Sequence, residues 1–276
     1  MVDPMTKLFS CIATGLLLLM NSWCSAQQQG PGMRSIPHWG MAFDLAGDCE
    51  FIAESGKLSI VVPGSAKPHG LSPSLGSDKA PRVLQSVRGD FTVTVRVDGT
   101  FEPTKESTQR ARIGYNGAGL LVMADERNFV RIERAGLHRP NGSEADFINF
   151  EMHVDGKLQR YGLPKDFPTD GSKPTWLRLE RKGDVMLGSM SHDLETWHAG
   201  EPKKLIAEAW RNEEALVGVV AISNSRIPFR PSYSSLLIKR DNRSVVQDPS
   251  VKPVAKPASP GSRLRFIDRL RLRVRR

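Results

Sequence analysis

Hydrophobic and polar residues alternate along much of the chain, and the pattern is clearest in the stretch Gly117–Arg134. An apolar run, Leu120–Ala124, is followed there by the polar break Asp125–Asn128 and then by a second run in which Val130 and Ile132 alternate with larger polar or aromatic residues. Alternation with a period of two is typical of a strand with one buried face, and Asp and Asn at the break favour a turn. The stretch therefore predicts a hairpin in the middle of an antiparallel sheet, with one face open to water.

Similar patterns recur between residues 36 and 240 and are separated by turn dipeptides such as Pro-Gly and Asp-Gly. The predicted strands include Leu58–Val62, Phe91–Val97, Ile148–Val154, Trp176–Glu180, Val185–Ser191, Leu216–Ile222 and Ser232–Lys239. Leu216–Ile222 is apolar on both faces, as a central strand of a two-layer stack would be. Only Lys203–Arg211 has a helical pattern of apolar residues. Many short strands and one short helix at most predict an all-β fold, a sandwich or barrel of antiparallel strands.

The two ends of the chain differ in composition from this middle part. Met1–Ala26 has a lysine, an apolar run of 13 residues and small residues before the end, which predicts a secretory signal peptide. A membrane anchor is the alternative, although the run is short for a span of about 20 residues. We expect a leader at residues 27–35, a domain at 36–240, a Pro/Ser-rich linker at 241–262 and an Arg-rich basic tail at 263–276. The chain is therefore expected to be exported, to a periplasmic or extracellular location.

The formal charge of +9 is concentrated in the basic tail and its linker. Residues 244–276 hold nine Lys and Arg against two Asp, which accounts for +7 of that charge. A nucleic-acid-binding domain is expected to carry its charge on the folded surface, so no specific nucleic-acid binding is expected here. The tail has the composition of a tether to anionic lipid or polysaccharide, and the alternative is a solvated end without a partner.

Metal and nucleophile motifs are absent from the sequence. Once the signal is removed, Cys49 is the sole thiol, so no disulfide can form within the mature chain. Its expected role is that of a small hydrophobic residue. The six histidines lack the spacing of a zinc site, and neither a phosphate-binding glycine loop nor a nucleophile elbow is present. We therefore expect no catalytic residue, no metal ligand and no cofactor.

The candidate binding surface is the polar face of the alternating strands. Sugar recognition combines aromatic rings, which cover C–H faces, with carboxylates and amides, which bind hydroxyl groups. If the strands are neighbours, such a mixture is offered by Phe129, Arg131, Glu133, Asn149, Glu151, His153, Trp176, Arg178 and Glu180. The alternative is a solvated sheet face with cross-strand Arg–Glu pairs, each contributing about 0.2–1 kcal/mol.

Eight short segments follow one another in a recognisable order: Gly47–Cys49, Lys57–Ile60, Ala80–Leu84, Gly89–Thr92, Ala118–Leu121, Asn128–Arg134, Ile148–Glu151 and Trp176–Arg181. In this order they resemble the concanavalin A-like family called domain of unknown function 1349, which is similar to YesU-type bacterial proteins and fungal regulation-of-enolase proteins. The copies that share these segments look like exported or envelope proteins of planctomycete-type bacteria.

The resemblance covers Trp39–Arg240 and leaves the basic tail outside. It implies a jelly-roll sandwich of two antiparallel sheets, in which the concave face often binds glycans. It implies no established activity, and it allows a structural calcium ion without locating one.

Two further expectations follow from the resemblance. Related jelly-roll glucanases carry their carboxylates on one strand as E-x-D-x-E, and this chain has no such run. The hairpin Ser191–Trp197 resembles the S-x-D-G-x-x-W turn of carbohydrate proteins, with Leu194 in place of the usual glycine, so a left-handed residue is in doubt there. We expect an exported, non-catalytic module that binds carbohydrate or an envelope polysaccharide. The alternatives are a glycan-active hydrolase or lyase and an envelope scaffold docked by its basic tail.

Overall fold

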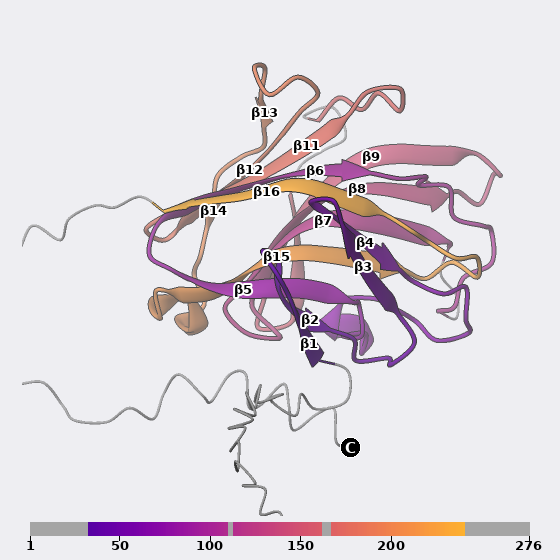
Figure 1. Ribbon diagram of the computed structural model, residues 1–276, viewed down its shortest axis with the longest axis horizontal. Helices are drawn as coiled ribbons and strands as arrows, with labels where there is room; N and C mark the ends of the chain where they lie inside the picture. The colour runs from indigo at the N-terminus through magenta and orange to yellow at the C-terminus, as the bar shows by residue number, and fades with distance from the viewer. Residues whose placement is uncertain (1–32, 110–112, 162–166, 241–276) are drawn as a thin grey trace, which may run out of the picture.

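The computed structural model describes residues 33–109, 113–161 and 167–240, and the chain there folds into two antiparallel β-sheets that stack on each other (Figure 1). The predicted all-β sandwich is therefore confirmed. The first strand begins at Met33, within the segment that was assigned to the leader, and the last strand ends at Arg240. The predicted signal peptide, linker and basic tail lie outside the described residues.

Sheet A contains eight strands and carries most of the predicted site. Its spatial order is β1 (Met33–Ile36), β2 (Gly40–Phe43), β5 (Arg82–Arg88), β15 (Glu214–Ser223), β7 (Tyr115–Met123), β8 (Phe129–His138), β9 (Glu144–Val154) and β10 (Lys157–Tyr161). β7 and β8 form the predicted hairpin, with Leu120 opposite Ile132 and Val122 opposite Val130. The strand that is apolar on both faces, β15, lies between β5 and β7 as expected.

Sheet B forms the second layer. Its order is β13 (His198–Ala199), β12 (Val185–Ser191), β11 (Thr175–Lys182), β6 (Phe91–Asp98), β16 (Ser232–Arg240), β4 (Lys57–Val61) and β3 (Glu50–Glu54), and β14 (Lys203–Lys204) pairs with β12. The two remaining elements are short 3₁₀ turns, η1 (Pro73–Leu75) and η3 (Glu208–Arg211).

The prediction of a helix at Lys203–Arg211 is wrong for most of that stretch. The chain is extended at β14 and makes only the turn η3 near the end. Its apolar residues Leu205, Ala207 and Trp210 are buried in the main core, so they pack inward from an irregular backbone and no helix is needed to bury them.

The main core fills the space between the two sheets. Alternate residues of each strand point inward, for example Val130 and Ile132 on β8 and Leu177 and Leu179 on β11, and all four are fully buried. β8 packs across from β11 and β12, and β7 packs across from β6 and β11. Burial of this kind stabilises the fold by about 25 cal/mol for each Å² of apolar surface removed from water.

A second apolar cluster lies on the outer face of sheet A. It joins sheet residues such as Leu84, Leu121 and Phe129 to Leu71 and Ala80, which belong to residues 63–80. We call residues 63–80 the cover segment. It also pairs through its backbone with β15, at His69 and Ser223, and its turn η1 packs against β10. The cover segment therefore removes much of this face from water.

Within the described ranges, no helix has the length and apolar composition required to cross a membrane.

Candidate functional site

The structure brings six of the nine candidate residues together on the outer face of sheet A. β8 and β9 pair so that Phe129 is opposite His153, Arg131 is opposite Glu151 and Glu133 is opposite Asn149. The shared surface was predicted on the condition that the strands are neighbours, and β8 and β9 meet this condition.

The other three candidates lie elsewhere, so the prediction of one shared surface is wrong. Trp176, Arg178 and Glu180 belong to β11, which pairs with β6 and β12 in sheet B. Their strand neighbours Leu177 and Leu179 point into the core, so these three side chains face away from sheet A. Alternation identifies which residues share a face of one strand, but it does not say to which sheet that strand belongs.

The face formed by β11 has contacts of its own. The Arg178 guanidinium carbon lies 3.4 Å from the centre of the Trp197 ring, and the Arg178 Nη1 lies 3.8 Å from the Glu180 Oε2. A cation on an indole face stabilises a surface by about 0.5–1 kcal/mol. This face matches the alternative prediction of a solvated sheet face with Arg–Glu pairs. Its arginine, Arg178, packs on an aromatic ring.

Arg131 is the centre of the cluster on sheet A. Its Nε lies 3.2 Å from the Glu133 Oε1, its Nη2 forms an ion pair with the Glu151 Oε1, and its Nη1 donates a hydrogen bond of 2.7 Å to the Leu71 carbonyl. The Nε contact is an ion pair without hydrogen-bond alignment, because that Nε has no hydrogen-bond partner. One guanidinium therefore holds two carboxylates and the cover segment at once.

The network extends to Tyr115 and Asn149. The Tyr115 hydroxyl donates a hydrogen bond of 2.5 Å to the Glu133 Oε1. The Asn149 Nδ2 donates to the same oxygen at 2.9 Å and to the Glu151 Oε2 at 3.0 Å. The second oxygen of Glu133, Oε2, is buried and has no hydrogen-bond partner. Gly117 makes room for this arrangement, because a Cβ there would lie 2.9 Å from both the Glu133 Oε2 and the Tyr115 hydroxyl.

His153 closes the other end of the network. Its Nε2 lies 3.1 Å from the Glu151 Oε1, and its ring stacks on Phe129 with centroids 4.3 Å apart. The opposite nitrogen, Nδ1, is buried without a partner. We refer below to Tyr115, Arg131, Glu133, Asn149, Glu151 and His153 as the network.

The two carboxyl groups of the network have opposite pKa shifts. Burial tends to raise the pKa of Glu151, but the charge of Arg131 and the hydrogen bond from His153 outweigh it and lower that pKa to about 2. Burial also raises the pKa of Glu133, and the nearby charge of Glu151 raises it further against the opposing effect of Arg131. Burial raises the pKa of the Tyr115 phenol too. Glu151 is thus held as a carboxylate, while Glu133 binds a proton more readily than an ordinary glutamate.

Most of the network is closed off from solvent, contrary to the wet face that the sequence predicted. The exposed fractions are 0% for Glu133 and His153, 4% for Glu151 and 6% for Arg131. The reason is the cover segment, whose Leu71 contributes both an apolar side chain and the carbonyl that Arg131 binds. Burying so many charges is costly unless each is paired, which explains the dense bonding of the network.

Three side chains at the edge of the network remain half-buried. They are Tyr115, Phe147 and Asn149, and the rings of Tyr115 and Phe147 meet edge to face with centroids 6.5 Å apart. We call these three residues the rim. Tyr115 and Phe147 were not among the sequence candidates. Extending the alternation of β7 back from Gly117, and that of β9 back from Asn149, would have placed both on the same face.

The predicted hairpin motif at Ser191–Trp197 has a structural role. The Asp193 carboxylate accepts hydrogen bonds from the backbone of Glu195 and Thr196, and the Trp197 indole donates one to the Leu194 carbonyl. Leu194 has a φ of 70°, so the turn keeps its left-handed residue although a leucine replaces the usual glycine. The doubt raised by the sequence is thereby resolved.

Comparison with solved structures shows that other chains share this two-sheet β-sandwich fold. A protein of unknown function from Saccharomyces cerevisiae matches with 17% identity and a TM-score of 0.52, over 71% of this chain and 98% of that chain. An engineered glycoside hydrolase of family 43 matches with 11% identity and a TM-score of 0.50, over 76% of this chain and 39% of that chain. The carbohydrate-binding module CBM66 from Bacillus subtilis matches with 11% identity and a TM-score of 0.43, over 75% of this chain and 99% of that chain.

The matches with TM-scores of 0.52 and 0.50 support the fold, and at such identities they do not assign an activity. The chain spans between 33% and 39% of the family 43 chains that it matches. No protein-family model matches the chain, and no curated protein matches it either. Membership of the family that the sequence resembles therefore stays a prediction.

Proposed function

We propose that the chain is an exported glycan-binding module whose contact surface is the rim on the outer face of sheet A. The observation that carries this proposal is the position of Tyr115 and Asn149, two half-buried side chains that are both fixed by hydrogen bonds to the buried Glu133. The rim therefore offers a phenol, an amide and an aromatic ring in one rigid arrangement.

This combination suits a sugar better than it suits an apolar or a strongly charged ligand. The rings of Tyr115 and Phe147 can cover the C–H face of a pyranose, while the phenol and the Asn149 amide exchange hydrogen bonds with hydroxyl groups. Arg131, Glu133 and Glu151 do not touch the ligand in this arrangement. They hold the rim in place, which lowers the entropy lost on binding. The sequence resemblance supports a glycan ligand in general, because it implies that one sheet face of the sandwich binds glycans.

A glycan array followed by calorimetric titration with the best ligand tests the proposal on the full chain. We expect Phe147→Ala to weaken binding by about tenfold or more, since a lost aromatic contact costs about 1 kcal/mol beyond its buried area. Tyr115→Phe keeps the ring and removes the hydroxyl, and it should weaken binding less. Trp176→Ala is the matched control, because it removes a ring that is also half-buried from the outer face of sheet B.

The effects of Phe147→Ala and Trp176→Ala on glycan binding show which sheet face binds the glycan. Binding that is lost in Trp176→Ala and kept in Phe147→Ala would place the glycan on sheet B and contradict the proposal. Absence of binding to any glycan on the array would remove the function altogether.

A second candidate function, a glycan hydrolase or lyase, is favoured by one specific observation. The Glu133 and Glu151 carboxyls bind the same Asn149 nitrogen at 2.9 and 3.0 Å. Their two bonded oxygens are thus at most about 6 Å apart, a limit that includes the separation of about 5–5.5 Å between the carboxyls of retaining glycosidases. One pKa is raised and the other lowered, which is the combination that an acid and its ionised partner require.

The burial of Glu133 distinguishes the two candidate functions. A reaction at Glu133 would require the cover segment to move away from the network, whereas binding at the rim requires no movement. Incubation of the full chain with its best glycan ligand, followed by measurement of new reducing ends and of unsaturated products, tests for catalysis. Product formation that is abolished in Glu133→Gln, with binding retained, would establish the enzyme; no product from the unaltered chain would exclude it for that ligand.

A further inference from the structure

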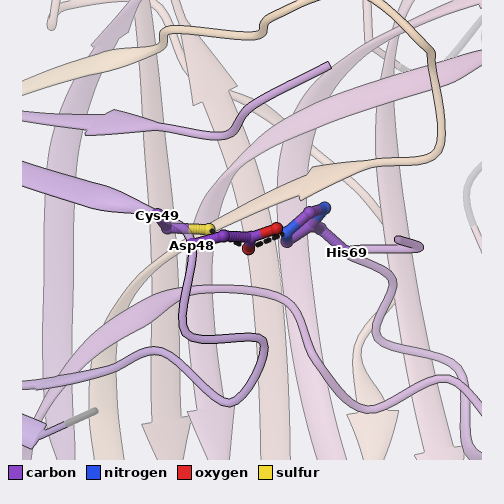
Figure 2. Close-up of side chains that lie close together, drawn as sticks. All are labelled: Asp48, Cys49 and His69. Carbon is purple, nitrogen blue, oxygen red and sulfur yellow. Dashed lines mark hydrogen bonds and ion pairs between the residues drawn. The ribbon is translucent and has the colours of Figure 1, made fainter. Parts of the chain in front are cut away.

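A cluster of three potential metal ligands lies outside the site described above. Asp48 and Cys49 precede β3, and His69 belongs to the cover segment. Figure 2 shows the three side chains pointing toward one another, with the Asp48 carboxylate between the thiol and the imidazole. One donor atom of each residue lies within 4.8 Å of the others, and the His69 Nε2 is 2.7 Å from the Asp48 Oδ1. The sequence did not connect them, because 19 residues without metal-site spacing lie between Cys49 and His69.

The backbone on both sides of the cluster is held firmly. The Asp44 carboxylate accepts hydrogen bonds from the backbone amides of Ala46, Gly47 and Cys49 at 2.8–3.1 Å. His69 exchanges two backbone hydrogen bonds with Ser223, at 3.0 and 3.1 Å. The donor atoms are therefore presented by two segments that are each fixed independently of the contact between Asp48 and His69. Such preorganisation is what a metal site requires.

The charges around the thiol favour a cation. The Cys49 Sγ lies 3.9 Å from the Asp48 Oδ1, and the Asp44 carboxylate binds the Cys49 backbone amide. The His69 side chain is only 1% exposed, while that of Asp48 is 21% exposed, so solvent reaches the cluster from the Asp48 side. Two carboxylates therefore lie next to the thiol, and their charge attracts a divalent cation.

We propose that Asp48, Cys49 and His69 form a binding site for a thiophilic divalent cation, with the donor set of a three-ligand Zn²⁺ site. Thiolate, imidazole and carboxylate are the three ligand types that zinc uses, at about 2.0–2.3 Å, and a water molecule completes the tetrahedron in sites with three protein ligands. Calcium and magnesium prefer oxygen donors and would make poor use of the sulfur and nitrogen atoms. Binding would displace the thiol proton and replace the hydrogen bond between His69 and Asp48 with two metal bonds.

Lys67 provides an internal competitor for the cation. Its ammonium lies 3.4 Å from the Asp48 Oδ2, and its side chain is 55% exposed, so it can swing into solvent when a metal binds. Because this positive charge opposes the incoming cation, Lys67→Ala should tighten metal binding by roughly threefold to tenfold. A structural ion pair without metal affinity would give no such gain.

Titration of the reduced full chain with Co²⁺, followed by displacement with Zn²⁺, tests the site. We expect one equivalent of Co²⁺ to give a sulfur-to-cobalt charge-transfer band that Zn²⁺ abolishes. Cys49→Ser should remove the band, and His69→Gln should weaken Zn²⁺ binding by more than about 100-fold, beyond the effect of losing an outer-shell partner. Circular dichroism of each variant checks that the fold is intact.

A matched control identifies the ligands. His138→Gln removes a histidine that forms a similar pair with a carboxylate, at 2.5 Å from Glu144, and it should leave metal binding unchanged. A charge-transfer band that survives in Cys49→Ser, or Zn²⁺ binding that is equal in His69→Gln and His138→Gln, would overturn the proposal.

Discussion

Replacement of Arg131 by methionine gives the sharpest test of how the outer face of sheet A is held together. The change keeps most of the side-chain volume and removes the cation shared by Glu133 and Glu151, together with the donor to the Leu71 carbonyl. Loss of one partner from a buried ion pair costs about 3–5 kcal/mol, because the remaining charges stay uncompensated. We expect Arg131→Met to lower the free energy of unfolding by that amount at pH 7.

The pH dependence distinguishes this mechanism from a simple packing defect. Without the arginine, both carboxyls are buried next to each other and their pKa values rise. Protonation therefore removes the unfavourable buried negative charges as the pH falls. The destabilisation should therefore be smaller at pH 5 than at pH 7. Adding Glu151→Gln to Arg131→Met should restore part of the stability at pH 7, since one of the two charges is then absent.

Urea unfolding followed by tryptophan fluorescence measures these differences. Arg178→Met is the control, because Arg178 packs on Trp197 at the surface of sheet B and its loss should cost less than about 1 kcal/mol. A loss below 1 kcal/mol in Arg131→Met, or an equal loss at both pH values, would refute the account of Arg131 as the essential cation of this face.

Three further outcomes are expected. The pKa of Glu151 is lowered to about 2, so its ionised carboxylate stabilises the fold above pH 4.5, and this stabilisation is lost as the pH falls toward 2. The acid-unfolding curve of Glu151→Gln should therefore lack this loss of stability. Leu194→Gly should raise the thermal unfolding temperature slightly, by relieving a left-handed leucine that is 46% exposed. Tyr233→Phe should lower the free energy of unfolding in urea by about 1–2 kcal/mol, because its buried hydroxyl donates to the Val220 carbonyl at 2.7 Å and joins sheet B to sheet A.

The strands could be predicted from the sequence because alternation is a local property of each strand. The turn at Asp125–Asn128 also predicted that β7 and β8 form a hairpin, and the structure confirms this. Which later strands are their neighbours was left as a condition, which β9 meets and β11 does not. Twenty residues lie between β9 and β11, and no local pattern selects one of the two sheets, so the grouping of Trp176 with β8 and β9 is wrong.

Burial of the candidate residues could not be predicted either. Arg131 and Glu133 look like solvated residues of an open sheet, and the segment that covers them has no strand pattern of its own. Its contact with the sheet depends on one backbone carbonyl, that of Leu71, which carries no sequence signature. The proximity of Cys49 and His69 could not be predicted for the same reason, because irregular segments of the chain bring them together.

The order of strands in the two sheets has a consequence for how the protein forms. β15 and β16 are the last strands in the chain, and each lies in the interior of a sheet, β15 between β5 and β7 and β16 between β4 and β6 (Figure 1). Sheet A cannot close until β15, which ends at Ser223, has left the ribosome, and sheet B cannot close until β16, which ends at Arg240, has done so. Contacts between such distant segments make folding slow, so a newly made chain stays open for longer, as the proposed export would require.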